Sequence, residues 1–183
     1  MHPPFFFNMN KSPLLIIIIF ILTSCVVKEG TKDNEFVENG LRYAKAFTIK
    51  STSNGDRVIT INNPWQNSKN KSFQYVLSRE KNQNNISVPV KKIICLSTTH
   101  IGYLQSLNCI SRVVGVSGSD YICNDSLQKS IVAGKTIDVG YQQSFNYEKM
   151  MGLKPDLVLI YGVDASVMQF YNKLSSLNIP SIF

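Results

Sequence analysis

From Pro89 to Phe183, short apolar runs alternate with segments that have helical spacing or helix-start residues. The apolar runs are typical of buried strands; they are 91–96, 112–116, 137–140, 157–161 and 181–183. Between them we expect helices, over 100–107, 127–132, 146–153 and 165–177. Strands that alternate with helices indicate a parallel sheet of the doubly wound type. The sequence therefore predicts an α/β fold for residues 89–183.

The segment 138–156 draws several of these features together. It holds a Val-Gly turn, two tyrosines, a helix start at Asn146 and a Pro-Asp helix stop. Ligands of doubly wound folds bind beyond the carboxyl ends of the strands. Those ends are predicted at 97–100, 117–121 and 161–164, with 141–144 beside them. We therefore expect any binding site of this protein close to this segment.

The chain begins with features of a secretory signal peptide. An uninterrupted apolar run, Leu14 to Leu22, follows Lys11 and ends at Thr-Ser-Cys25. The run is too short to span a bilayer, which takes about 20 residues, and it has no amphipathic stripe that would favour a core helix. Its ending resembles the bacterial lipobox, in which Cys25 becomes the diacylated N-terminus of the mature protein. Residues 1–25 are thus a predicted lipoprotein signal peptide, with Met9 an alternative start to Met1.

Residues 26–40 are polar and lack helical periodicity, and we expect a flexible tether there. Residues 41–88 predict a small antiparallel β appendage and a linker. Three alternating runs, 42–49, 57–61 and 72–78, indicate a meander, and the polar stretch 80–87 indicates the linker. For Trp65, packing of the appendage against the α/β domain is favoured over contact with a ligand, because a small sheet must bury one face.

The composition weighs against other classes of function. The net charge of +7 comes from scattered basic residues without a run of five, so a solvated surface is favoured over a nucleic-acid partner. The chain lacks the phosphate-binding, dinucleotide and hydrolase motifs, and we expect no catalytic residues, no cofactor and no metal site. Of the later cysteines, Cys95 is predicted to be buried. The sequence leaves two alternatives for Cys109 and Cys123, a disulfide between them or two free thiols.

Three segments carry a family resemblance: VKKIICLSTTHIGYLQSLNCISRVVGVSGSDY, DVGYQQSFNYEKMMGLKPDLVLIYG and KLSSLNIPSIF. In this order they resemble the N-terminal lobe of periplasmic substrate-binding proteins that deliver ferric siderophores, haem or cobalamin to ABC importers. The resemblance covers 89–183, and the lipobox and β appendage also look like lipoprotein members. It implies a non-enzymatic, lipid-anchored component on the periplasmic side of a bacterial membrane.

The resemblance also implies roles for individual residues. Glu148 matches the glutamate with which the family docks to arginines of the permease. A carboxylate after the Asn146 cap is favoured by the helix dipole, and an ordinary helix-start carboxylate is the alternative. The family's ligand-binding loops match hydroxyl, imidazole and phenol side chains here: Thr98, Thr99, His100, Tyr121, Tyr141 and Tyr161. His100 is either an iron or haem ligand or an ordinary polar contact.

Family members continue into a second lobe, whereas this sequence ends at Phe183 within an expected strand. We expect a truncated or split reading frame, with an exposed sheet edge and core face. Two alternatives to the importer component stay open. One is a surface lipoprotein that holds haem or a metal chelate without an importer, and the other is a fragment of an α/β nucleotide-binding enzyme.

Overall fold

The computed structural model describes residues 37–39, 43–82, 85–141 and 144–183. The predicted signal peptide, Cys25 and most of the predicted tether lie outside these residues. Every described residue belongs to one compact unit, which lies within 34–183.

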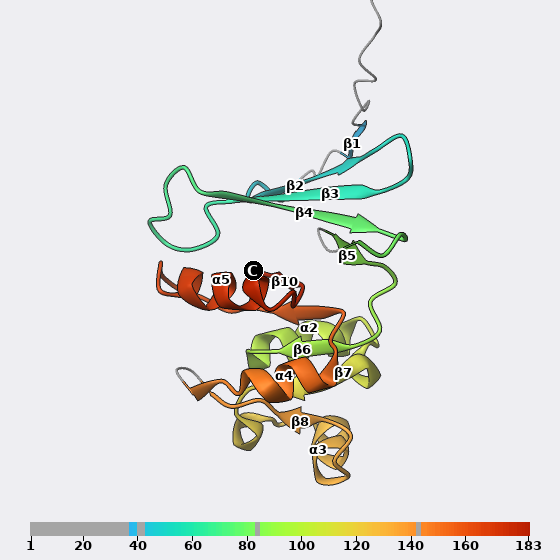
Figure 1. Cartoon of the computed structure of the whole chain (residues 1–183), viewed down its shortest axis with the longest axis vertical. Coiled ribbons are helices and arrows are strands. Elements are labelled where there is room, and N and C mark those ends of the chain that lie inside the picture. Colours follow the sequence, from blue (N-terminus) through green and yellow to red (C-terminus); the bar gives the residue numbers. More distant parts are fainter. Residues whose placement is uncertain (1–36, 40–42, 83–84, 142–143) are drawn as a thin grey trace, which may run out of the picture. The chain divides into compact units, whose positions relative to one another are not determined.

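The predicted doubly wound α/β fold is confirmed (Figure 1). Its strands are β6 (Ile93–Cys95), β7 (Val113–Val116), β8 (Ile137–Asp138), β9 (Leu157–Leu159) and β10 (Ser181–Ile182). They form one sheet in the order β10-β9-β6-β7-β8, and all neighbouring pairs are parallel. The chain adds β7 and β8 on one side of β6 and then returns to add β9 and β10 on the other. The strand order therefore reverses between β6 and β9.

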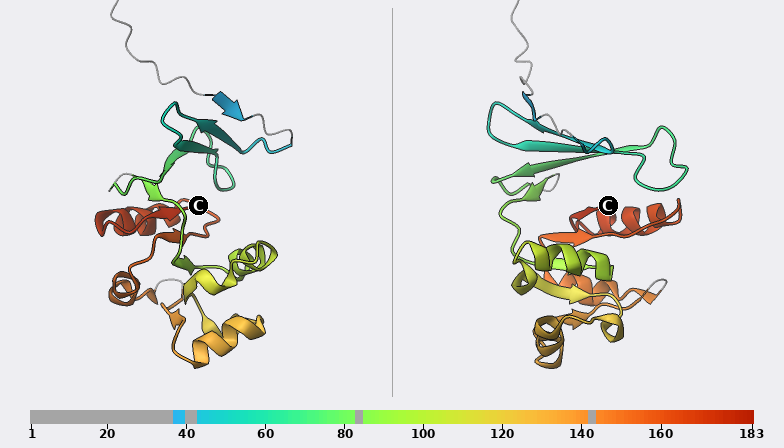
Figure 2. Two further views of the ribbon diagram at one scale, coloured as in Figure 1. Left: turned by 90° about the vertical axis from the view of Figure 1, so that its right-hand side faces the viewer. Right: turned by 180° about the vertical axis from the view of Figure 1, so that it is seen from behind.

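Helices cover both faces of this sheet (Figure 2). They are α2 (Thr98–Ser106), α3 (Asp125–Val132), α4 (Tyr147–Leu153) and α5 (Val167–Ser176). Neighbouring residues of β6 face opposite cores: Ile93 and Cys95 pack in the cluster that contains residues of α2 and α3, and Ile94 packs with residues of α4 and α5. Burial of both faces explains why the strands are apolar runs without polar alternation.

Side-chain caps fix where three of the helices begin. Ser97, Asn124 and Asn146 accept hydrogen bonds from backbone N–H groups in the first turns of α2, α3 and α4. The predicted cap at Ser97–Thr99 and the helix start at Asn146 are confirmed. Helix α2 begins earlier than predicted, because Ser97 is the capping residue and both threonines are already helical.

Asp156, which follows the Lys-Pro helix stop, ties the amino ends of two central strands together. Its carboxylate accepts hydrogen bonds from the backbone N–H groups of Lys91 (2.8 Å) and Lys92 (2.9 Å). This aligns the segment before β6 with the start of β9, the strand that pairs with it.

The preceding β sheet has more strands than the predicted meander. Its strands are β1 (Val37–Asn39), β2 (Phe47–Ser51), β3 (Arg57–Asn62), β4 (Ser72–Ser78) and β5 (Ile86–Ser87), in that order. Strand β1 falls in the predicted tether and β5 in the predicted linker, so both predictions are wrong at these residues. Both strands pair through backbone groups with an open sheet edge, which needs no apolar alternation in their own sequence.

Trp65 is 9% exposed and belongs to a core cluster that includes residues of α4 and α5. Its ring lies 6.0 Å from that of Phe73 and 5.8 Å from that of Phe183, and Phe73 lies 5.6 Å from Tyr171 of α5. The predicted packing role of Trp65 is thus confirmed. Phe183 packs against the same rings.

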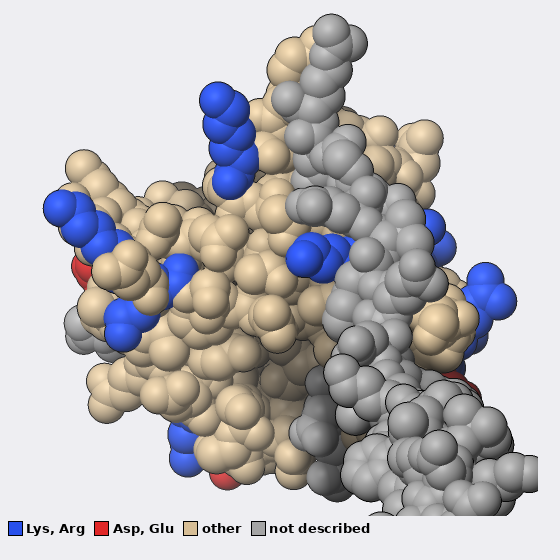
Figure 3. Space-filling view, turned by 90° about the horizontal axis from the view of Figure 1, so that it is seen from above, with Lys and Arg blue, Asp and Glu red and all other residues tan. Residues whose placement is uncertain are grey.

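The described residues include no disulfide between the cysteines and no cluster suited to a metal ion. Cys95 is buried as predicted, and Cys109 and Cys123 are free thiols, so the possible disulfide is not formed. No group of three or more His, Cys, Asp or Glu residues suited to a metal ion occurs in the described ranges. Within the same ranges, no helix is long and apolar enough to cross a membrane. On the face drawn in Figure 3, lysines and arginines stand apart from one another.

Candidate functional site

The predicted ligand residues all lie at the carboxyl edge of the parallel sheet, in loops or first helical turns. The loops after β6 and β9 start side by side, because the Leu96 N–H donates to the Leu159 carbonyl (3.2 Å). Thr98 and Thr99 follow β6, and Tyr161 follows β9, so they flank the point where the strand order reverses. Doubly wound folds bind ligands at such a point.

Tyr121 and Tyr141 form an exposed aromatic pair at this edge. Their ring centroids lie 5.6 Å apart with a tilt of 40°, and the side chains are 64% and 48% exposed. Both rings pack over Gly118, where an added Cβ would lie 2.9 Å from the ring of Tyr121 and 3.1 Å from that of Tyr141. Gly118 has a φ of +67°, a conformation that favours glycine. The positive φ of Gly118 and the absence of a side chain there therefore allow the two tyrosine rings to pack together.

Asp138, the last residue of β8, holds the loops of this pair. Its carboxylate accepts hydrogen bonds from the backbone N–H of Ser119 (2.7 Å) and of Gly140 (2.8 Å). Burial by itself would raise the pKa of Asp138, but these backbone hydrogen bonds outweigh it and hold the pKa below its ordinary value. Sequence reasoning missed this residue. The available signal was an aspartate at a strand end, directly before a Val-Gly turn.

Replacing Asp138 with asparagine is expected to destabilise the protein by about 1–2 kcal/mol, because charge-assisted hydrogen bonds to both loops are lost. A carboxylate with a depressed pKa stabilises the fold above its ordinary pKa, and this contribution disappears as the pH falls through the folded value. For Asp138 the loss begins below about pH 3.8. The amide NMR chemical shifts of Ser119 and Gly140, recorded as the pH is lowered, would follow the protonation of Asp138. The Asp120→Asn variant, which changes an exposed neighbour, is the control. Shifts in Asp138→Asn that still follow the wild-type acid transition would contradict the assignment.

The structure divides the other predicted residues between two hollows. Thr98 and Tyr121 line one hollow between the starts of α2 and α3. Tyr161, which is 60% exposed, lines a separate and larger hollow beside α4 and α5, with Phe145 and Tyr147 on its wall. Tyr161 is therefore at the same edge of the sheet as the tyrosine pair but in a different depression.

His100 lies in the first turn of α2, and its Nδ1 is buried without a hydrogen-bond partner. Burial lowers the pKa of the imidazole, so it is neutral at pH 7. A ligand does not reach the buried Nδ1 without rearrangement, and no metal-binding group of residues was found among the described positions. The geometry gives no support to ligation through Nδ1.

Glu148 is exposed in the first turn of α4, after the capping residue Asn146. The next residue, Lys149, turns back toward the sheet and donates from its ammonium group to the Asp138 carbonyl (3.1 Å). The segment that positions Tyr141 thus continues directly into the helix that presents Glu148, and the carboxylate stays accessible to a partner.

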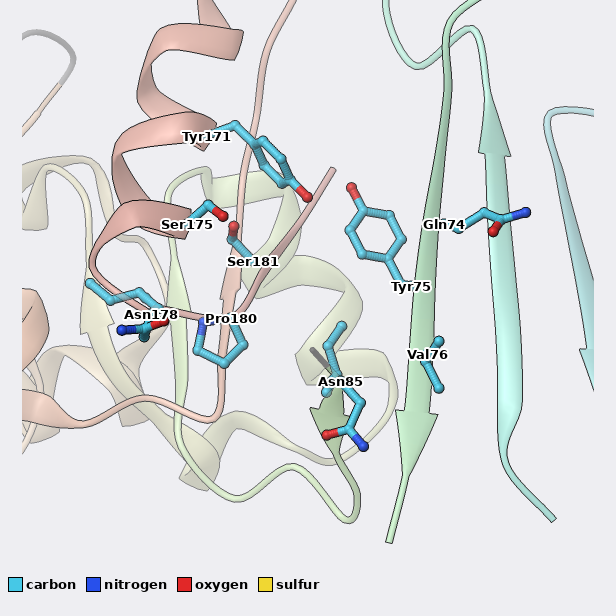
Figure 4. Close-up of a pocket in the computed structure, with 11 residues that line it drawn as sticks. Gln74, Tyr75, Val76, Asn85, Tyr171, Ser175, Asn178, Pro180 and Ser181 are labelled. Atoms are coloured by element: carbon cyan, nitrogen blue, oxygen red, sulfur yellow. The ribbon is translucent and has the colours of Figure 1, made fainter. Parts of the chain in front are cut away.

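Another hollow, which the sequence did not predict, lies between β4, β5, the end of α5 and β10 (Figure 4). Tyr75 of β4 and Tyr171 of α5 direct their hydroxyl groups toward one another there. Tyr75 is only 5% exposed, and burial raises the pKa of its phenol, so that it stays neutral. None of the predicted ligand residues lines this hollow.

Comparison with known proteins agrees with the resemblance drawn from the sequence. Residues 93–176 match the family model described as periplasmic binding protein. An uncharacterized lipoprotein of Methanocaldococcus jannaschii is 29% identical over 82 residues, which are 42% of this chain and 20% of that protein. The crystal structure of the periplasmic vitamin B12 binding protein BtuF of Vibrio cholerae is 25% identical with a TM-score of 0.39; the match covers 51% of this chain and 34% of that one.

This chain therefore spans only a fifth of the matched lipoprotein and about a third of the matched structure. The family match covers β6 to α5, the part of the chain that carries the tyrosine pair and Glu148. The match covers slightly less than half of the chain and is a similarity to the periplasmic binding protein family, whose members are binding proteins and not enzymes.

Proposed function

We propose that this chain is the lipid-anchored substrate-binding component of an ABC importer, and that its ligand is a ferric siderophore, haem or cobalamin. The observation that carries the proposal is the exposed Tyr121–Tyr141 pair at the carboxyl edge of the matched segment. Aromatic faces suit flat macrocycles and aromatic chelates, and nearby hydroxyl groups suit their polar edges. Thr98 and Thr99 supply such hydroxyl groups at the same edge.

Calorimetric titration of the full-length protein with ferric siderophores, haem and cobalamin tests this proposal. Tyr141→Ala is expected to weaken binding about tenfold, because an aromatic contact contributes about 1.4 kcal/mol. Tyr103→Ala is the matched control, since Tyr103 is a 65% exposed tyrosine on α2. Trp65 is an unsuitable fluorescent reporter, because it is buried in the aromatic cluster. Absence of binding to all of these ligands would overturn the proposal.

Glu148 is proposed to dock to an arginine of the permease, which a carboxylate can bind through two parallel hydrogen bonds. We expect Glu148→Ala to bind ligand with unchanged affinity and to support at least tenfold slower uptake in cells. Glu80→Ala, which removes another exposed carboxylate, serves as the control. Normal uptake by the Glu148 variant would contradict the docking role.

Cys25 is proposed to carry the lipid anchor that holds the protein on the periplasmic side of the membrane. Mass spectrometry of the protein purified from membranes should find acyl chains on Cys25, and Cys25→Ala should release the protein from the membrane fraction. An unmodified Cys25 in the membrane-bound protein would count against this anchor.

A further inference from the structure

The carboxyl edge of the sheet lacks basic residues in its loops, although the chain as a whole has a net charge of +7. The loop segments 96–100, 117–124, 139–146 and 160–166 contain no lysine or arginine. They contain Asp120 beside Tyr121 and Asp164 shortly after Tyr161, and Asp138 directly precedes the third segment. The surroundings of the tyrosines are thus acidic on an otherwise basic chain.

Three of the helix N-termini at this edge, those of α2, α3 and α4, carry a side-chain cap. A free helix N-terminus attracts anions through its N–H groups and its dipole. Here Asp125 and Glu148 occupy the first turns of α3 and α4. Helix α5 has no side-chain cap and no acidic residue in its first turn, although Asp164 lies just before it and accepts a hydrogen bond from the Ser166 N–H (2.8 Å). Helix α2 has no acidic residue in its first turn, but the Ser97 hydroxyl caps it.

Lys149 and Lys173 approach this edge from the helices, and Lys173 lines the same hollow as Tyr161, but both lysines already interact with other groups. The Lys149 ammonium donates to the Asp138 carbonyl, and the Lys173 ammonium lies 5.9 Å from the centre of the Tyr147 ring. For Asp138 and Asp164 the pKa lies below its ordinary value, so these two carboxylates are ionised at neutral pH. Hydrogen bonds from Ser166 lower the pKa of Asp164, and those from Ser119 and Gly140 outweigh burial at Asp138.

We propose that this edge binds an uncharged or cationic ligand and discriminates against anionic ones. This inference rests on the proposed function and narrows its ligand class. Ferric hydroxamates and amide-bearing corrinoids can form hydrogen bonds with the tyrosine and threonine hydroxyl groups. Ferric tris-catecholates, and haem through its propionates, would bring negative charge next to Asp120 and Asp164. Like charges brought together in a binding site select against the wrong ligand.

Calorimetry on the full-length protein with three probes tests the proposal: cationic ferrioxamine B, neutral cyanocobalamin and anionic ferric enterobactin. We expect the cationic or the neutral probe to bind at least tenfold more tightly than the anionic one. Asp120→Lys should change the ratio of affinities for the cationic and anionic probes at least tenfold in favour of the anion, and less so at high salt. Glu80→Lys makes the same change in net charge away from these loops and should leave the ratio unchanged.

Tighter binding of ferric enterobactin by the wild-type protein would overturn this inference and leave the proposed function intact. An affinity ratio that does not respond to Asp120→Lys, or that responds equally to Glu80→Lys, would also overturn it. Binding of none of the three probes, nor of haem, would overturn the proposed function and the inference with it.

Discussion

Replacement of Trp65 by alanine is expected to lower the free energy of unfolding by about 3–5 kcal/mol, the range for removing a large aromatic side chain from a core. Trp65 is 9% exposed, and its ring packs against Phe73 and against Phe183, which follows β10. Phe73 also lies 4.8 Å from Phe183. Removal of the indole ring would open a cavity between the β sheet and the α/β domain. The remaining aromatic rings come from different elements and would lose the side chain that they share as a contact.

Urea denaturation followed by circular dichroism would measure this loss. Tyr103→Ala is the control, because Tyr103 is 65% exposed and its truncation should change the stability by less than about 0.5 kcal/mol. A loss below about 1 kcal/mol for Trp65→Ala would mean that the two sheets do not depend on this cluster.

Gly140→Ala is expected to destabilise the protein by about 2–4 kcal/mol. Gly140 has a φ of +92°, a conformation that L-residues avoid at a cost of about 1–2 kcal/mol. An added Cβ would also collide with the backbone carbonyl oxygen of Ser144, which forces the loop to shift and adds strain. Because Tyr141 is the next residue, the same change should disturb the aromatic pair and weaken ligand binding.

Gly102→Ala provides the opposite control within the same fold. Gly102 lies in α2, and an added Cβ would meet nothing within 4 Å. Alanine there should stabilise the protein by about 0.5–1 kcal/mol, since glycine is a poor helix former. Thermal unfolding of both variants would measure these opposite changes in stability. Equal stability of Gly140→Ala and the wild type would show that the turn tolerates a side chain.

The sequence predicted the elements of the α/β domain well, because their signals are local. Apolar runs bounded by turn residues marked the strands, and Ser97 and Asn146 marked helix starts. Strands β1 and β5 were missed for the opposite reason. They are short, their sequences lack alternation, and they exist because a neighbouring strand offers free backbone groups.

The loop organisation of the candidate site was only partly predictable. Ligands of doubly wound folds bind beyond the carboxyl ends of the strands, and this rule correctly predicted that the six ligand residues lie at one edge of the sheet. It did not separate Tyr161, which lines its own hollow, from the paired tyrosines. It also did not show that the Nδ1 of His100 is buried. Both facts depend on side-chain packing between elements that are distant in the sequence.

The order of strands and helices, the edge at which their loops meet and the presence of tyrosines in those loops all follow from local sequence patterns. The contact between Tyr121 and Tyr141, which makes them one surface, follows from tertiary packing. That pairing needs the positive φ of Gly118 and a hydrogen bond from Ser119 to Asp138, a residue from the neighbouring strand. A contact between two loops depends on how the strands that carry them pair, and no local sequence pattern records it.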